Sequence, residues 1–429
     1  MRIRIYNARI LAMNGDTRVT AGEIGIEDDK ILYVGSPVTD AGDKPLWDRE
    51  IDAGGNLIMP GFKNAHTHSA MTFLRSYADD LPLQEWLTQQ VFPMEAKLKP
   101  EHVLWFTKLA IMEYLTSGIT ANFDMYMYQD MIAQAAVDTG FRTVWVSGLN
   151  DFVSSPEEVE RDYLRLNNYH DLVSSQIGFH AEYTCSEELL KKVAELARKY
   201  QAPVYTHLAE TERETRECAE RHGLTPLKYL DSLGMFDYGG GVYHGIYLDD
   251  EEIGIAKEKN ISVVTNPGSN TKLASGICRT TDLLDAGVNM AIGTDGPASN
   301  NCLDFFREMF LVTGLGKLRE KDAAAVPAED VIAMATVGGA RAMGLNDCDC
   351  LAAGKQADLI MIDLQQPNMQ PVHNIVKNLV YSGSKQNVRM TMVAGKILYE
   401  DGNYDIGVEP DEVYAKAEEL IKRDFLQEE

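Results

Sequence analysis

Two histidines separated by one residue lie in the stretch "PGFKNAHTHSAMTFLRSYADDLPLQEWL", residues 60–87. His66 and His68 follow the apolar run "NLIMPGF", which is typical of a buried strand. Residues i and i+2 of a strand point to the same side, so both imidazoles can face one metal ion. A lone histidine at a strand end is more often a hydrogen-bonded polar residue. The pair therefore needs further ligands elsewhere in the chain.

Other strand-like pieces also end in polar residues that can do chemistry. These are His180 in "IGFHAEYT", His207 and Glu210 in "VYTHLAET", His244 in "GVYHGIYL" and Asp295 in "AIGTDGPASNN". Five of the nine histidines thus end predicted strands, and the other four lie elsewhere: His102, His170, His222 and His373. Packing alone does not explain such a concentration on one predicted rim.

This set matches the needs of a catalytic zinc site. Zinc takes nitrogen and oxygen ligands and keeps one position open for water, and the candidate ligands are His66, His68, His207 and Asp295. A bound divalent cation lowers the pKa of its water to about 7, and Asp295 can take the proton of that water. Glu210 lies three residues beyond His207 and suits general acid/base work. His244 can hydrogen-bond the attacking water or polarise the scissile centre.

The middle of the chain predicts the elements that would bring these residues together. Residues 58–350 alternate eight strand-like pieces with helical ones, as a closed (β/α)₈ barrel requires. In such a barrel the polar residues at the strand ends meet at one face. An open doubly wound sheet is the rival, but no G-x-G-x-x-G motif opens a helix after the first strand.

The two chain ends predict a second, smaller unit. Residues 1–57 and 351–405 both read as short strands punctuated by Gly and Asp, and they can pair into one β-domain. Residues 406–429 then predict a terminal helix. The expected fold is a TIM-like barrel inserted into a small β-domain that both chain ends build.

Composition limits the partners. The 429 residues carry a formal net charge of −25, which disfavours nucleic acid and anionic membranes and leaves a neutral or zwitterionic small molecule. The six cysteines form no CxxC pair, which favours reduced thiols. A signal-peptide core and a run of about 18 apolar residues are both absent. We therefore expect a cytoplasmic protein, and the sequence leaves a homo-oligomer open.

These motifs together resemble the amidohydrolase superfamily, and most closely the branch of 5-methylthioadenosine/S-adenosylhomocysteine deaminases and related chlorohydrolases. The resemblance covers nearly the whole chain and rests on the phrases "MPGFKNAHTH", "DDLPLQEWL", "THLAET", "NPGSNTKLASG" and "GTDGPASNN". It implies a distorted (β/α)₈ barrel with a flanking β-sandwich. It also implies hydrolytic deamination of an adenosine derivative to the inosine derivative and ammonia.

The resemblance assigns roles to individual residues. It implies metal ligation by His66, His68, His207 and Asp295, proton transfer by Glu210, and a supporting role for His244. It further implies that Trp86 contacts the nucleoside, that Glu95 binds the ribose hydroxyls and that His180 reaches the ribose or purine. "GFHAEYT" lacks the lysine that two-metal relatives carry, which implies one zinc ion per chain, with iron or manganese as alternatives.

Three questions stay open at this level. The same fold could act on a free base, a pterin or a triazine instead of a nucleoside. A non-enzymatic scaffold is a second alternative, although it should have lost its metal ligands. Arg161 and Arg165 are the arginines nearest to the end of the third barrel strand, and neither can be assigned to a substrate carboxylate.

Overall fold

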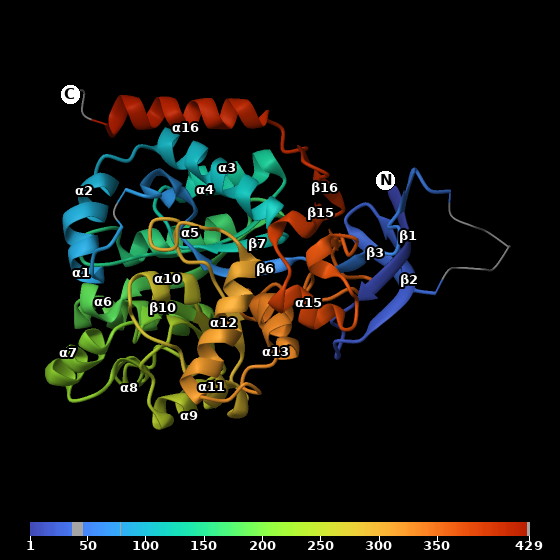
Figure 1. Ribbon diagram of the computed structural model, residues 1–429. Helices are drawn as coiled ribbons and strands as arrows, with labels where there is room; N and C mark the ends of the chain where they lie inside the picture. Colours follow the sequence, from blue (N-terminus) through green and yellow to red (C-terminus); the bar gives the residue numbers. More distant parts are fainter. Residues whose placement is uncertain (37–45, 78, 427–429) are drawn as a thin grey trace.

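Two sheets organise the molecule. The computed structural model describes residues 1–36, 46–77 and 79–426. One sheet is an eight-stranded parallel barrel surrounded by helices, and the other is a nine-stranded sheet that both chain ends build (Figure 1). The structure therefore confirms the predicted fold class.

The barrel strands pair in sequence order from β6 to β13. They are β6 (Phe62–Thr67), β7 (Ile119–Asp124), β8 (Arg142–Val146), β9 (Val173–Ala181), β10 (Val204–Leu208), β11 (Gly240–His244), β12 (Ile261–Thr265) and β13 (Met290–Ile292). Nearly every residue of these strands is buried, as expected for parallel strands covered on both faces. One difference from the expected strands is that "LIMPGFKNAH" divides at Gly61, and only its second half enters the barrel.

The two outer strands of this sheet, β6 and β13, come together and close the barrel. The Asn64 side chain exchanges two hydrogen bonds with Thr294, of 2.7 and 2.9 Å. The backbone N–H of Asp295 donates to the carbonyl of His66 at 3.1 Å. Gly293 permits this approach, because a Cβ there would lie 2.8 Å from the His66 carbonyl oxygen. The seam thus brings His66 and Asp295 side by side.

Helices follow the barrel strands and cover the outside of the barrel. After β6 come a 3₁₀ turn (Ser69–Leu74), α1 (Leu83–Glu85), a π-helical turn (Trp86–Val91), α2 (Phe92–Glu95) and α3 (Pro100–Thr116). Later strands are followed by α4 (Gln129–Thr139), α5 (Pro156–Leu166), α6 (Glu187–Tyr200), α7 (Glu212–His222), α8 (Pro226–Ser232), α9 (Asp250–Glu258), α10 (Pro267–Lys272) and α11 (Thr280–Asp285). After β13 come α12 (Phe305–Glu320), α13 (Ala328–Ala333), a π-helical turn (Met334–Gly338) and α14 (Gly339–Met343).

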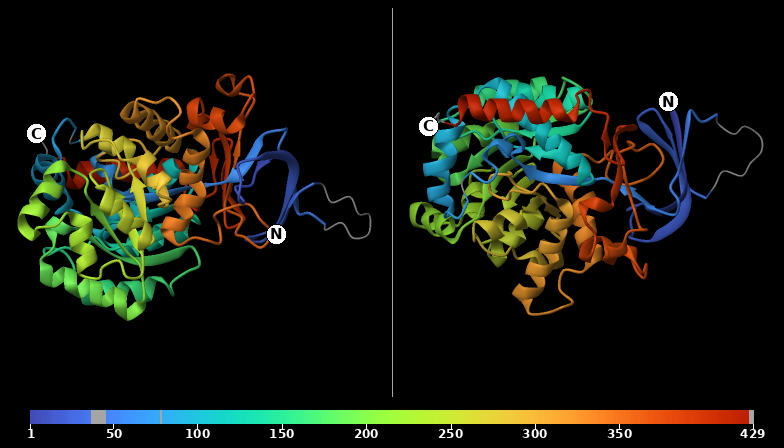
Figure 2. Two further views of the ribbon diagram at one scale, coloured as in Figure 1. Left: turned by 90° about the horizontal axis from the view of Figure 1, so that it is seen from below. Right: turned by 45° about the horizontal axis from the view of Figure 1, so that its top comes forward.

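The second sheet lies beside the barrel. Its strands are β1 (Arg2–Leu11), β2 (Val19–Glu27), β3 (Lys30–Gly35), β4 (Arg49–Asp52) and β5 (Leu57–Pro60), then β14 (Leu359–Ile362), β15 (Val388–Val393), β16 (Lys396–Glu400) and β17 (Asn403–Tyr404). They pair antiparallel, except that β1 runs parallel to β4 and β5. The two views of Figure 2 show the blue N-terminal strands and the red C-terminal strands together on one side of the barrel.

The predicted boundaries can be located in this fold. The boundary between 57 and 58 falls inside β5, which pairs with β14. The segment 351–405 contains β14 to β17 and α15 (Ile375–Tyr381), and 406–429 contains α16 (Pro410–Asp424). Residues 37–45 of the first segment and 427–429 of the last lie outside the described residues. As a division into domains, these boundaries remain a prediction.

The C-terminal helix returns to the barrel. α16 lies along α3 (Figure 1), where the His102 ring bonds to Asp424 at 2.7 Å. All six cysteines are free. Within the described parts of the chain, no helix is both long and apolar enough to cross a membrane.

Candidate metal centre and active site

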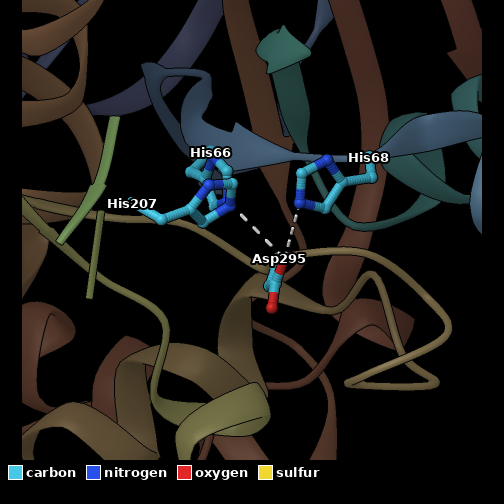
Figure 3. Close-up of side chains that lie close together, drawn as sticks. All are labelled: His66, His68, His207 and Asp295. Atoms are coloured by element: carbon cyan, nitrogen blue, oxygen red, sulfur yellow. Dashed lines mark ion pairs between the residues drawn. The ribbon is translucent and has the colours of Figure 1, made fainter. Parts of the chain in front are cut away.

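The four predicted metal ligands meet at the carboxyl ends of three barrel strands. One ligand atom from each of His66, His68, His207 and Asp295 lies within 4.8 Å of every other (Figure 3). The Oδ1 atom of Asp295 is 3.1 Å from Nε2 of His68 and 3.5 Å from Nε2 of His66. All four side chains are buried or nearly so. Three imidazoles and one carboxylate around one point are ligands that zinc takes.

Backbone carbonyls orient two of the histidines. Nδ1 of His68 lies 2.6 Å from the carbonyl oxygen of Met125, and Nδ1 of His207 lies 2.7 Å from that of His180. A carbonyl oxygen only accepts, so each Nδ1 carries a proton, and the neutral form of each ring has its lone pair on Nε2. Such outer contacts fix the tautomer that a metal ion needs.

His66 shows most directly that the site fits a metal ion. Its side chain is fully buried, and its ring stacks on Tyr243 with centroids 3.8 Å apart. Among the described residues, neither of its ring nitrogens has a hydrogen-bond partner. Leaving buried polar atoms unsatisfied costs about 1–3 kcal/mol. A cation bound to Nε2, the nitrogen that faces Asp295, would satisfy one of the two, so the residues fit one divalent ion.

Asp295 is held by a network of its own. Its Oδ2 accepts from the hydroxyls of Ser269 and Ser299 at 2.7 and 2.8 Å, and the backbone N–H of Gly296 donates to Oδ1 at 2.8 Å. Burial alone would raise the pKa of Asp295, but the adjacent His66 and His68 imidazoles hold that pKa well below its usual range. The carboxylate therefore stays ionised and aimed at the histidines.

Glu210 and His244 form the second half of the site. Burial raises the pKa of Glu210, and the Ser275 hydroxyl donates to its Oε1 at 3.4 Å. Nδ1 of His244 donates to the amide oxygen of Asn270 at 2.7 Å, which leaves Nε2 as an acceptor 3.8 Å from Glu210 Oε2. The pair can pass or hold a proton beside the metal ligands.

The predicted substrate-binding residues come from the segment before α3 and from β9. Trp86 is buried on the π-helical turn, and its indole nitrogen has no partner among the described residues. Glu95 ends α2 and accepts from the Tyr126 hydroxyl at 2.6 Å. Burial raises the pKa of Glu95, although the hydrogen bond from Tyr126 opposes the shift.

His180 connects β9 to the ligand set. Its ring centroid is 5.0 Å from that of His207, and its Nδ1 bonds to the Thr184 hydroxyl at 3.0 Å. Burial lowers the pKa of His180 to about 4. A neutral imidazole at this place can donate to or accept from a substrate.

Several functional contacts were absent from the sequence-based assignment. They involve Ser269, Ser299, Asn270, Tyr126 and Glu214. Three of them lie in "NPGSNTKLASG" and "GTDGPASNN", phrases that carried the resemblance. Small hydroxyl and amide residues directly after a strand were the available signal, but nothing in the sequence says which ligand each one supports.

An eight-stranded parallel barrel with three histidines and an aspartate at its strand ends defines a metal-dependent barrel hydrolase. Residues 57–398 match the family model described as "Amidohydrolase family". The chain belongs to the amidohydrolase family, as the resemblance implied. This membership accounts for the barrel and the ligand set together.

Proteins named 5-methylthioadenosine/S-adenosylhomocysteine deaminase are among the relatives. The one from Caldicellulosiruptor saccharolyticus is 39% identical over 94% of both chains. The one from Moorella thermoacetica is 39% identical over 97% of this chain and 98% of its own. The one from Desulfitobacterium hafniense is 41% identical over 92% and 93%.

Solved structures show the same fold. An adenosine deaminase from Xanthomonas campestris with bound zinc superposes with a TM-score of 0.92, 33% identity and 98% coverage of both chains. A zinc complex of atrazine chlorohydrolase from Arthrobacter aurescens has a TM-score of 0.89 and 22% identity, covering 98% of this chain and 100% of its own. At that identity the second likeness shows the fold alone.

Proposed function

We propose that this chain is a zinc-dependent aminohydrolase that converts an adenosine derivative to the inosine derivative and ammonia. The observation that carries the proposal is the placement of Glu210 and His244 beside the four ligands, with Glu95 and Trp86 on the segment before α3. The names of the relatives and the 33% identical adenosine deaminase support the same reaction.

The residues divide the reaction between them. His66, His68, His207 and Asp295 would hold a divalent ion, and such an ion would provide a nucleophile at neutral pH by lowering the pKa of a bound water to about 7. Water adds to C6 of adenine while Glu210 gives a proton to N1. As ammonia leaves from C6, the proton that remains on the C6 hydroxyl returns to Glu210 and the carbonyl of the inosine derivative forms. Asp295 takes the proton of the attacking water and passes it to the departing nitrogen. His244 accepts a hydrogen bond from that water through Nε2, because its Nδ1 is committed to Asn270.

Glu95, Trp86 and His180 hold the nucleoside. A carboxylate offers two acceptors that suit a ribose 2′,3′-diol, and the Tyr126 hydroxyl fixes one oxygen of Glu95 in place. The indole of Trp86 offers an apolar face. His180, on β9, contacts the ribose or the purine. Zinc is the proposed metal, and iron and manganese are alternatives that metal analysis separates.

The loop after β8 favours an uncharged group at the 5′ carbon. A substrate carboxylate needs a cation, but Arg161 and Arg165 are both bound to Asp162, at 3.1 and 3.2 Å. The loop itself presents Phe152 and Val153, whose exposed fractions are 88% and 49%. We expect 5′-methylthioadenosine, 5′-deoxyadenosine or adenosine to be turned over faster than S-adenosylhomocysteine.

The test is a substrate panel with purified protein. It contains the four nucleosides above, free adenine, guanine and cytosine, a pterin and a chlorotriazine. Deamination is followed by the adenine-to-hypoxanthine absorbance change and by ammonia release. Turnover of a nucleoside with little or none of the free bases supports the proposal. Preferred turnover of a free base, the pterin or the triazine would replace it with the corresponding alternative.

Three sequence-based predictions complete the proposal. They are a cytoplasmic location, no partnership with nucleic acid or membranes, and a homo-oligomer as an open alternative to a monomer. Fractionation and light scattering test them.

A further inference from the structure

The chain makes a tight turn between the metal ligand His207 and the acid/base residue Glu210. Ala209 has a φ of +52°, in the left-handed region that residues with a Cβ seldom adopt. The carbonyl of Ala209 accepts from the backbone N–H groups of Ile246 and Tyr247 at 3.0 and 3.1 Å. The loop after β11 therefore holds the carbonyl side of the turn.

One buried side chain holds the amide side. Oε1 of Glu214 accepts from the backbone N–H of Ala209 at 2.8 Å, and Oε2 accepts from that of Glu210 at 2.9 Å. Glu214 lies in the first turn of α7, and its own N–H bonds to the hydroxyl of Thr211 at 3.1 Å. Its exposed fraction is 6%, so water competes little for these bonds.

The Glu214 carboxylate is held by backbone N–H groups rather than by basic side chains. Within residues 1–36, 46–77 and 79–426, Glu214 forms no ion pair with a lysine, arginine or histidine. Burial, followed by the charge of Glu210, raises the pKa of Glu214 to about 7. The chain thus keeps a buried carboxyl group four residues from Glu210, while α7 is capped by the side chain of Thr211.

We propose that Glu214 is a positioning residue for the reaction. By bonding two consecutive amides it fixes the left-handed turn at Ala209, and that turn aims the Glu210 carboxyl group toward His244, 3.8 Å away. Glu214 acts through Glu210 and touches neither metal nor substrate. This inference rests on the proposed function for its catalytic readout, and the exchange measurement below is independent of it.

The rival explanation is that Glu214 only stabilises the start of α7. In that case its loss would lower the melting temperature and leave turnover by the folded enzyme unchanged. A positioning role predicts that kcat changes and that KM does not. The value of kcat falls while KM and the zinc content stay close to those of the wild type, because the ligands and Glu95 are untouched.

Glu214→Gln is the main variant. Glutamine keeps the volume but offers one oxygen, so its NH₂ group faces a backbone N–H and one amide loses its acceptor. We expect kcat to fall by about 10- to 100-fold, the scale of a displacement of about 1 Å at a reacting group. Glu220→Gln is the matched control on the exposed side of α7, where Glu220 lies 3.9 Å from Arg216, and it should behave like the wild type.

A double-mutant cycle shows whether the effect passes through Glu210. In the Glu210→Gln background, adding Glu214→Gln should change kcat by less than about 3-fold, since there is no acid/base group left to aim. Independent, multiplying losses in kcat would overturn the proposal. If Glu214→Gln fails to fold, Glu214→Asp retains two acceptor oxygens on a shorter side chain and should show a smaller loss of the same kind.

Hydrogen exchange provides the readout that needs no substrate. In metal-loaded protein, Glu214→Gln should speed exchange in peptides covering residues 208–212 and leave those from β1 unchanged. Unchanged exchange at 208–212 would refute the proposal directly. If the wild type deaminates no adenosine derivative but these amides lose protection in the variant, the proposed function fails and the role of Glu214 in fixing the turn stands.

Discussion

The two ends of the barrel treat buried polar groups in opposite ways. At the carboxyl end, the ring nitrogens of His66 and the indole nitrogen of Trp86 have no partner among the described residues. Ala209, His244 and Asp295 are among the residues other than glycine that adopt left-handed φ values there. Local backbone strain of this kind costs energy and persists where function requires a side chain to be aimed.

At the amino end, Arg142, Asp358 and Lys63 form a buried cluster in which each charged group has hydrogen-bond partners. Arg142, at the start of β8, binds Asp358 through two hydrogen bonds of 2.7 and 3.0 Å. The N–H of Ala394 adds a third bond to Asp358 at 2.7 Å. Lys63 is fully buried and donates to the Gly61 carbonyl and the Thr120 hydroxyl at 3.0 and 2.8 Å.

This difference between the two ends of the barrel indicates that the amino end serves stability and the carboxyl end serves function. The amino-end cluster joins the barrel to the nine-stranded sheet, because Asp358 directly precedes β14. The hydrogen bonds of its charged groups are made within the protein, so this cluster is not arranged to bind a ligand. The carboxyl end is incomplete until a metal ion and a substrate supply the missing partners. Barrel enzymes as a class place their active sites at that end. Substitutions at the two ends should therefore change different quantities.

The largest loss of turnover is expected from Asp295→Asn. The amide lacks the charge of the carboxylate and cannot take the proton of the attacking water. Loss of metal-assisted catalysis removes about 4 kcal/mol or more of transition-state stabilisation, a rate loss of roughly 1000-fold. Metal analysis should find about one ion per wild-type chain and much less in the variant.

Chelator-treated wild-type protein is the control for this loss. Adding zinc back should restore wild-type turnover but not that of Asp295→Asn. Two tightly held ions per chain would contradict the single-metal site that the absence of a lysine from "GFHAEYT" implies.

Glu210→Gln should have the next largest effect. General acid/base catalysis contributes roughly 10²- to 10⁴-fold, so kcat should fall by at least 10²-fold. The metal content and substrate binding should persist, since Glu210 is not among the four ligands. Glu212→Gln, two residues away on the exposed start of α7, is the matched control. A kcat close to normal in Glu210→Gln would remove this residue from the mechanism.

Glu95→Ala tests the proposed ribose-binding contact at the carboxyl end of the barrel. Losing a charged hydrogen-bond partner costs about 1.5–3 kcal/mol, or roughly 10- to 150-fold in kcat/KM for a nucleoside. Activity on a free base, which has no diol, should change little. Glu85→Ala in α1 removes an exposed glutamate from the same segment and serves as the control. Unchanged nucleoside turnover in Glu95→Ala would place the ribose elsewhere.

The same contrast shows what the sequence could reveal. His66, His68, His207 and Asp295 were predictable because strand alternation and strand ends determine where a side chain points. Trp86 and Glu95 were assigned only through the resemblance. They lie on short helices and a π-helical turn, whose direction depends on packing against α3 and α16 rather than on a local period.

Glu214 and the Arg142–Asp358 pair were not predicted for a different physical reason. Both depend on contacts between a side chain and partners that the sequence does not locate. Asp358 is 216 residues from Arg142, and no local pattern connects them. Glu214 reads as an ordinary acidic residue in the first helical turn until the amides of Ala209 and Glu210 are seen on its carboxylate.

The smallest effect on turnover is expected from Asp358→Asn, which should affect stability instead. The substitution leaves Arg142 buried without its counter-charge, and breaking a buried pair in this way costs about 3–5 kcal/mol. For a chain of this length that corresponds to a fall of about 3–6 °C in melting temperature, with kcat within about 2-fold of the wild type. The matched control is Asp401→Asn. Asp401 makes the same two-bonded contact with Arg389, but with side chains 43% and 51% exposed, so its loss should cost less than about 1 kcal/mol.

The pH dependence sharpens this last comparison. Burial alone would raise the pKa of Asp358, but Arg142 lowers it below its usual range. A carboxyl group with a lowered pKa in the folded state contributes stability above its unfolded pKa of about 3.9, and loses that contribution as the pH falls through the folded value. The difference in melting temperature between the wild type and Asp358→Asn should therefore be full near pH 7 and shrink below about pH 4. A melting temperature equal to that of Asp401→Asn at pH 7, or a kcat that falls as steeply as in Glu210→Gln, would mean that the two ends of the barrel do not divide stability and function as the contacts indicate.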